Sequence, residues 1–273
     1  VPEMSILSNG LYTVILDDRG IGFSKYKNLQ INRYRKVSNE NYGVFFYIRN
    51  LKTNNVWSNT YAPLYDKPKN YKVVFASDRV KYMREDEGII TSSEITVVKD
   101  HNAEIRRLTF QNNNDYDVTL EVTSYGEVII ARNEEDVAHR AFNSITITSE
   151  ADPETSSLIF SRKSKTKENT RYYIINRMFL GKNDDNSFEY ETSRDKFIGR
   201  NNTVSNPDVI INNKKLSKSL DCSLDSIMSI RKQIKIEARS KNTLYWVVGF
   251  GKSREQVMEV IEAYKDEFTI SKA

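Results

Sequence analysis

Apolar and polar residues alternate along most of this chain. From Val118 to Thr123, valine and leucine side chains alternate with threonine and glutamate, and this period of two predicts a strand with one buried face. Polar turns rich in Asn, Asp and Gly separate this segment from others like it. Many short strands at such spacing predict an all-β fold, a large antiparallel sandwich. Further strands are predicted at Leu11–Leu16, Val44–Ile48, Tyr71–Phe75, Ile89–Val97, Ile105–Phe110, Leu158–Ser161, Tyr172–Ile175, Ile230–Ile236 and Leu244–Phe250.

One helix is predicted near the C-terminal end of the chain. Ser253 can cap its N-terminus, and Gln256 stands at the N3 position of a capping box. The residues from Val257 to Tyr264 then place apolar side chains at helical spacing, which gives the helix one buried face. A shorter helix is predicted at Glu134–Ala141. No interdomain linker is evident, so we expect residues 1–273 to form a single domain.

The composition suits a soluble, globular protein with a large core. Hydrophobic residues make up 38% of the chain and charged residues 29%. The net charge of +4 is too balanced to predict nucleic-acid binding. Cys222 is the single cysteine, which excludes an internal disulfide and a cysteine-based zinc site. Because neither a membrane-length apolar run nor a signal-peptide pattern is evident, we expect a cytoplasmic protein that does not bind membranes.

Two glycine-containing segments match known phosphate-binding loops only in part. Gly249–Ser253 has the tail of a P-loop, but Trp246 stands where that motif requires its first glycine. The capping role of Ser253 explains this segment better. Gly20 and Gly22 lack the third glycine and the following helix of a dinucleotide-binding loop, so they indicate a turn and a bulge.

Two segments carry side chains suited to a sugar. Arg33 and Arg35 flank Tyr34, so guanidinium groups can reach sugar hydroxyls while the ring stacks on the apolar sugar face. The alternative is a structural arginine that pairs with a carboxylate. Trp57 and Tyr61 are four residues apart, and on an extended strand they would share one face. That face is either a sugar platform or a wall of the core.

Acid–base chemistry has few candidates. His101 lies in a polar turn and is expected to be exposed, whereas His139 follows an acidic stretch and is the better candidate for a structurally fixed position. Two histidines and a glutamate could catalyse aldose mutarotation if they converged. The spacing gives no support for a metal site. Cleavage of a glycosidic bond requires two carboxyl groups roughly 5–10 Å apart. The candidates for such a pair are Glu127, Glu150, Glu191 and Asp195.

Several short motifs stand in a characteristic order along the chain. They are Gly20–Ser24, Asn32–Arg35, Val56–Tyr61, Ser124–Val128, His139–Phe142, Tyr190–Arg200 and Leu224–Ile230. Together they resemble the N-terminal β-domain of glycoside hydrolase family 94. That family includes cellobiose-type phosphorylases and the phosphorylase-like part of cyclic β-1,2-glucan synthases, and the detailed pattern is similar to the synthase branch. The resemblance covers essentially the whole chain.

This resemblance implies a fold for the chain and a separate catalytic domain in the same enzyme. The fold would be an antiparallel β-supersandwich of the galactose mutarotase-like type with a short C-terminal helix. In this family the catalytic acid and the phosphate site belong to an (α/α) barrel that follows the β-domain. We therefore expect this chain to be the N-terminal part of a longer, homodimeric enzyme. The start at Val1 without an initiator methionine implies either processing or excision from a longer protein.

The function implied by the resemblance is that of a non-catalytic, carbohydrate-binding and scaffolding domain of a glycoside phosphorylase or glycosyltransferase acting on β-glucans or β-glucosides. No catalytic residue, cofactor or metal is then expected in this chain. The alternatives are a stand-alone mutarotase-like or epimerase-like enzyme and a purely structural dimerisation module. The chain departs from the family pattern at Tyr34, Lys36, Tyr42 and Arg140. Carbohydrate contacts are predicted for Arg33, Tyr34, Arg35, Trp57, Tyr61, His139 and Arg200.

Overall fold

The computed structural model describes residues 3–35, 41–163, 170–220 and 225–272. Its strands form three antiparallel sheets of five, eight and five strands, so the predicted all-β fold is confirmed. In spatial order the first sheet contains β1 (Met4–Ser8), β2 (Tyr12–Asp17), β3 (Gly22–Tyr26), β4 (Leu29–Asn32) and β12 (Val128–Ala131). The second contains β13 (Ile147–Asp152), β14 (Ser157–Lys163), β15 (Arg171–Leu180), β18 (Lys241–Gly251), β10 (Ala103–Asn112), β9 (Ile89–Val97), β8 (Val80–Asp86) and β7 (Asn70–Phe75). The third contains β16 (Glu189–Ser193), β17 (Ser226–Ile236), β11 (Val118–Tyr125), β5 (Phe45–Asn50) and β6 (Val56–Ser58).

Each strand that the alternation predicts is present, and β9 has the predicted bounds. The strands that the sequence analysis did not predict are β1, β3, β4, β6, β8, β12, β13 and β16. Most of them are short, so they carry too few alternating residues to give a pattern. In addition, β12 pairs with β4, which is distant in sequence.

Side chains from all three sheets meet in one core. Val14 of β2, Phe46 of β5 and Trp246 of β18 are buried in the same cluster. The inner face of the eight-stranded sheet therefore packs against both five-stranded sheets. Burial of this apolar area is the main stabilising contribution, at roughly 25 cal/mol per Å² removed from water.

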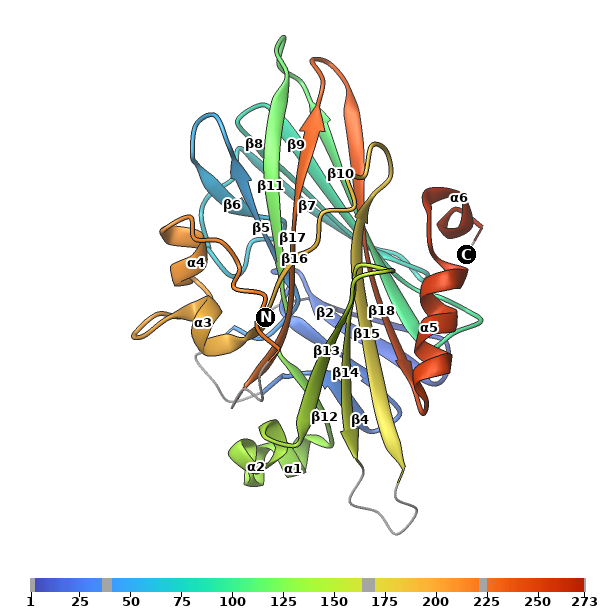
Figure 1. The fold of residues 1–273 in the computed structure, drawn as a ribbon. Helices are drawn as coiled ribbons and strands as arrows, with labels where there is room; N and C mark the ends of the chain where they lie inside the picture. The colour runs from blue at the N-terminus through green and yellow to red at the C-terminus, as the bar shows by residue number, and fades with distance from the viewer. Residues whose placement is uncertain (1–2, 36–40, 164–169, 221–224, 273) are drawn as a thin grey trace.

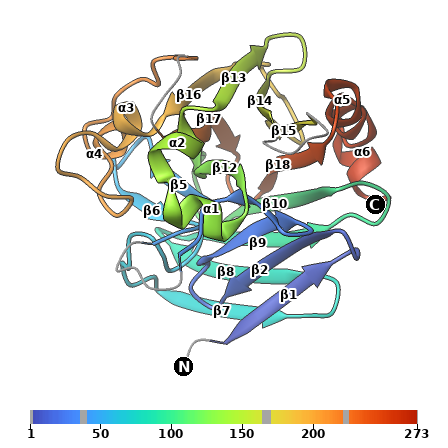
Figure 2. The same cartoon turned by 90° about the horizontal axis from the view of Figure 1, so that it is seen from below.

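Helices cover the outer surfaces of this sandwich. Figure 1 shows α5 and α6 on one side of the molecule and α3 and α4 on the other, and Figure 2 shows α1 and α2 together near β12. None of the described helices is long and apolar enough to cross a membrane. The helices are α1 (Asn133–Ala138), α2 (Arg140–Ser144), α3 (Arg194–Ile198), α4 (Asp208–Ile211), α5 (Arg254–Ala263) and α6 (Glu267–Ile270).

The predicted C-terminal helix is α5, and its capping is confirmed. The hydroxyl of Ser253 accepts a hydrogen bond from the backbone N–H of Gln256 at 3.3 Å. The Gln256 side chain accepts a hydrogen bond from the backbone N–H of Lys252 at 2.8 Å. In a standard capping box this donor is the N–H of the cap residue itself, so here the return hydrogen bond comes from the residue before Ser253. Gly249 of β18 lies under this helix, since a Cβ atom there would stand 2.8 Å from a methyl carbon of Val260. The glycine therefore allows α5 to pack closely on the sheet.

The predicted helix at Glu134–Ala141 is two short helices instead of one. The backbone breaks at His139, where φ is −143° and ψ is 58°. This break turns the chain between α1 and α2 and positions buried Asp136 and Ser144 on the inner side of the pair.

We predict that the Ser253→Ala variant lowers the free energy of unfolding by about 1 kcal/mol, because it removes the acceptor for an otherwise unpaired helix N–H. Ser253→Asp keeps an acceptor at the same position and serves as the control, with stability close to that of the wild type. Chemical denaturation measures both values. Equal losses in the two variants would show that the cap does not stabilise α5.

Candidate functional site

One buried arginine lies at the centre of a network of charged side chains. Arg33 follows β4 and is 2% exposed. Its Nη1 atom donates to Glu127 Oε2 at 2.6 Å and to Asp225 Oδ1 at 3.0 Å. Its Nε and Nη2 atoms donate to the two carboxylate oxygens of Asp136 at 3.0 and 3.1 Å. A single guanidinium thus joins the end of β4, the β11–β12 turn, α1 and the segment before β17.

Three further arginines extend this network. Arg194 Nε donates to Glu127 Oε1 at 3.0 Å, Arg140 Nη2 donates to Asp225 Oδ2 at 2.9 Å, and Arg35 Nη2 reaches Asp136 Oδ2 at 3.4 Å. We call the whole set the arginine–carboxylate cluster. Its members are Arg33, Arg35, Glu127, Asp136, Arg140, Arg194 and Asp225.

The cluster shifts the titration of its own members. Burial alone would lower the pKa of Arg33, but hydrogen bonds to Asp136 and the charges of Glu127, Asp136 and Asp225 raise it well above its ordinary value. Burial favours a higher pKa for Asp225, yet the hydrogen bond from Arg140 and the nearby guanidinium charges lower it overall. Both shifts favour the charged forms, so Arg33 and Asp225 stay ionised at neutral pH.

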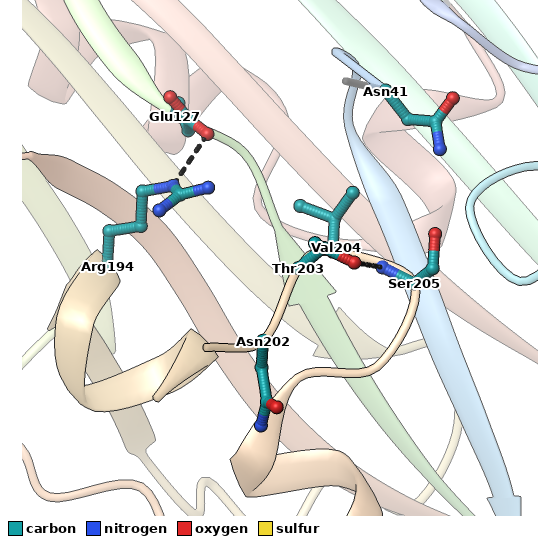
Figure 3. Close-up of a pocket in the computed structure, with 7 residues that line it drawn as sticks. All are labelled: Asn41, Glu127, Arg194, Asn202, Thr203, Val204 and Ser205. Atoms are coloured by element: carbon teal, nitrogen blue, oxygen red, sulfur yellow. Dashed lines mark hydrogen bonds and ion pairs between the residues drawn. The ribbon is translucent and has the colours of Figure 1, made fainter. Parts of the chain in front are cut away.

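A cavity of about 200 Å³ lies beside the cluster, with Glu127 and Arg194 in its wall. Figure 3 shows the Arg194 guanidinium bonded to Glu127, with one terminal nitrogen directed toward the Thr203–Ser205 loop. The cavity is smaller than the roughly 300–1,000 Å³ of typical small-molecule pockets, so it suits one small group. We call it the Arg194 cavity, and its lining residues are Asn41, Glu127, Arg194, Asn202, Thr203, Val204 and Ser205.

The predicted Arg-Tyr-Arg segment lies partly within this region. Arg33 is fully paired with carboxylates, which is the structural arrangement that the sequence analysis left open as an alternative. Tyr34 is half-buried and stacks on Phe23, with ring centroids 4.8 Å apart. Arg35 is half-buried and also donates to the backbone carbonyl of Asp136 at 3.2 Å. These contacts orient the segment against α1.

Trp57 and Tyr61 do not share a strand face. The strand β6 ends at Ser58, so the extended geometry assumed for this pair stops between the two residues. Trp57 is 2% exposed and belongs to the core shared by the three sheets. Tyr61 is half-buried and packs edge-on against Tyr65, with ring centroids 5.3 Å apart. Tyr65 in turn donates a hydrogen bond to Asn41, which lines the Arg194 cavity.

The two histidines lie in different parts of the fold. His139 is exposed between α1 and α2, and it is not among the residues that line the Arg194 cavity. His101 is half-buried, and its Nδ1 atom lies 2.9 Å from the hydroxyl of Tyr264. The prediction that His101 is simply exposed is therefore wrong, because the residue after α5 covers it. Arg200 is exposed and belongs to the same loop as Asn202.

The four carboxylates singled out from the sequence have separate roles. Glu127 belongs to the arginine–carboxylate cluster. Glu191 is buried and accepts hydrogen bonds from the backbone N–H groups of Thr192 and Ser193, each at 3.0 Å. Glu150 is exposed and pairs with an arginine of α5, and Asp195 is exposed on α3. None of these shares the Arg194 cavity with Glu127.

The sequence analysis did not identify most of the residues that line the cavity. Arg194 falls inside the predicted motif Tyr190–Arg200, so the motif marked the segment without indicating which side chain faces a cavity. The Asn202–Ser205 turn and Asn41 come from loops with no periodic pattern. Only the packing of α3 and α4 on the third sheet brings them together.

Comparisons with known proteins identify relatives over nearly the full sequence. The sequence model described as "Glycosyl hydrolase 94, supersandwich domain" matches residues 1–267. The cyclic beta-(1,2)-glucan synthase NdvB of Rhizobium meliloti (strain 1021) is 24% identical over 265 residues, which are 96% of this chain and 9% of that protein. The N,N'-diacetylchitobiose phosphorylase of Vibrio furnissii is 20% identical over 257 residues, 92% of this chain and 31% of that protein.

The fold also has a counterpart among solved structures. A putative aldose 1-epimerase from Escherichia coli K12 superimposes with a TM-score of 0.51 at 9% sequence identity, covering 93% of this chain and 100% of that one. This likeness confirms the predicted mutarotase-like architecture. The chain spans less than a third of the length of the two curated relatives above.

We predict that Arg33→Gln lowers the free energy of unfolding by about 3–5 kcal/mol, because it leaves buried carboxylates without their shared counter-charge. The control is Arg35→Gln, which removes two long contacts to Asp136 at a half-buried site and should cost well under half as much. Urea denaturation of both variants measures the difference. Similar losses in the two would contradict the central position of Arg33.

Acid should destabilise the protein through Asp225. Its pKa is lowered in the folded state, so its stabilising contribution is complete above the ordinary aspartate pKa of about 3.9 and is lost as the pH falls through the folded pKa. Denaturation at several pH values should show a loss of stability below about pH 4 that is smaller in Asp225→Asn. An identical pH profile in the variant and the wild type would exclude this contribution.

Proposed function

Because this chain belongs to the glycosyl hydrolase 94 supersandwich domain family, we propose that it is a carbohydrate-contacting and scaffolding domain of a longer glycoside phosphorylase or glycosyltransferase. The family match over residues 1–267 is the observation that carries this proposal. Both curated relatives are much longer than the matched region. In this proposal, residues 1–273 are one domain, and the catalytic machinery belongs to another part of the enzyme.

The chemistry of the Arg194 cavity supports a non-catalytic role. Cleavage of a glycosidic bond requires two carboxyl groups roughly 5–10 Å apart. Glu127 is the one carboxylate among the residues that line this cavity. Its oxygens already accept hydrogen bonds from Arg33, Tyr125 and Arg194, at 2.6 to 3.0 Å. A single carboxylate occupied in this way does not provide the pair of carboxyl groups that glycosidic cleavage needs.

The carbohydrate that we propose is a β-glucan, with β-1,2-linked glucose as the preferred class. One relative is named as a cyclic beta-(1,2)-glucan synthase. Of the residues predicted to contact sugar, Tyr34, Arg35 and Tyr61 are half-buried, and His139 and Arg200 are exposed, so their side chains are accessible to a ligand. The buried Arg33 and Trp57 would act by supporting these neighbours.

The scaffolding part of the proposal has its own support. Val137, Phe142 and Ile145 on and after the α1–α2 pair are 58%, 51% and 51% exposed. Exposed apolar side chains grouped in this way are typical of surfaces that contact another protein domain. We propose that the parent enzyme is a homodimer, as the family resemblance implies. We also propose that it is cytoplasmic, because the sequence has a single cysteine.

Titration calorimetry with linear β-1,2-gluco-oligosaccharides, and with cellobiose for comparison, tests the carbohydrate role. We expect saturable binding that prefers the β-1,2 series. Tyr61→Ala should weaken it about fivefold, the effect of losing roughly 1 kcal/mol of aromatic contact. Tyr116→Ala is the matched control, since this tyrosine is 49% exposed in the turn between β10 and β11. Absence of binding at millimolar sugar would reduce the function to scaffolding.

A further inference from the structure

Two side chains that line the Arg194 cavity offer hydrogen-bond donors that have no partner among the described residues. Arg194 uses its Nε–H for Glu127, and its two terminal nitrogens have no hydrogen-bond partner among the residues that the structure describes. Asn41 accepts the Tyr65 hydroxyl through Oδ1, so the carboxamide oxygen is occupied while the Nδ2 donor is free within the described part of the chain. Ser205 contributes its hydroxyl to the same lining.

The acceptors of Glu127 and Thr203 in the same wall are already occupied. Glu127 accepts from Arg194 and Tyr125 at Oε1 and from Arg33 at Oε2. The Thr203 hydroxyl accepts from the backbone N–H of Ser205 at 3.2 Å and lies 2.9 Å from Asn206 Oδ1, to which it donates. A ligand that entered the cavity would therefore find N–H groups of Arg194 and Asn41 that are free among the described residues, while the acceptors of Glu127 and Thr203 are already occupied.

The net charge of the arginine–carboxylate cluster favours an anionic ligand. The arginine–carboxylate cluster contains four guanidinium groups and three carboxylates. Arg194 is the member that lines the cavity together with Glu127, and its side chain is 19% exposed. Since one positive charge remains unbalanced within this set, an anionic group beside Arg194 would gain from it.

We propose that the Arg194 cavity binds an oxyanion, and that its ligand is the carboxylate of an acidic saccharide. The planar guanidinium presents parallel N–H donors that match the two oxygens of a carboxylate, and Asn41 adds a further donor to the same lining. The cavity volume of about 200 Å³ accommodates one such group with part of its ring. The saccharide part of this assignment rests on the proposed carbohydrate role, whereas the oxyanion part rests on the donor set alone.

Titration of the 273-residue chain with glucuronate, glucose and inorganic phosphate at matched ionic strength tests this assignment. We expect glucuronate to bind at least about tenfold more tightly than glucose, since a charge-assisted hydrogen-bond pair contributes that much. The affinity for glucuronate should fall as salt is added. Phosphate that displaces glucuronate would show recognition of any oxyanion, and phosphate that does not would show recognition of the carboxylate in particular.

Variants assign the binding to named side chains. Arg194→Gln should lose about tenfold in glucuronate affinity, and Arg194→Lys should lose part of it because lysine keeps the charge without the planar fork. Asn41→Ala removes a donor outside the arginine–carboxylate cluster and should weaken binding a few-fold without affecting folding. Arg239→Gln is the control for charge, since Arg239 is 63% exposed and pairs with Asp115.

Two results would overturn the assignment. Equal affinities for glucuronate and glucose would exclude an oxyanion site while leaving the proposed carbohydrate role intact. Glucuronate preference that survives unchanged in both Arg194→Gln and Asn41→Ala would place the acidic ligand elsewhere on the protein. Binding of phosphate but of neither sugar would retain the oxyanion site and remove its saccharide ligand.

Discussion

The pairing of Arg33 with buried carboxylates is the interaction on which the arrangement around the candidate site depends. Its partners Glu127, Asp136 and Asp225 are 94, 103 and 192 residues away in the sequence. They come from the β11–β12 turn, α1 and the segment before β17. A buried guanidinium requires such partners, because an unpaired charge away from water costs several kcal/mol. Any movement of these segments away from Arg33 would leave buried charges unpaired, so the ion pairs hold the segments in one relative position.

This constraint also gives the Arg194 cavity its chemistry. Glu127 is shared between Arg33 inside the protein and Arg194 at the cavity wall. The hydrogen bond from Arg194 Nε to this carboxylate orients the Arg194 guanidinium and leaves its two terminal nitrogens without a partner among the described residues. The same pairing that stabilises the fold thus sets which donors face the cavity.

Local pattern was sufficient for much of the fold. The alternation at Val118–Thr123 predicted β11, and the capping residues Ser253 and Gln256 predicted the start of α5. Such signals involve residues within a few positions of each other, so the sequence contains them directly. The short strands and α3 and α4 gave no such signal. In their case burial against a distant sheet, not local preference, decides the structure.

The sequence by itself determined the fold class, the family and which residue types could contact a sugar. It could not decide the roles of Arg33 and Trp57, since a buried ion pair and a sugar contact use the same arginine, and a core wall and a stacking platform use the same tryptophan. Tertiary structure decided these cases by burying both side chains. The tertiary structure also places Arg194 in the wall of the cavity. Burial and charge pairing depend on residues far apart in the chain, and only folding brings those residues together.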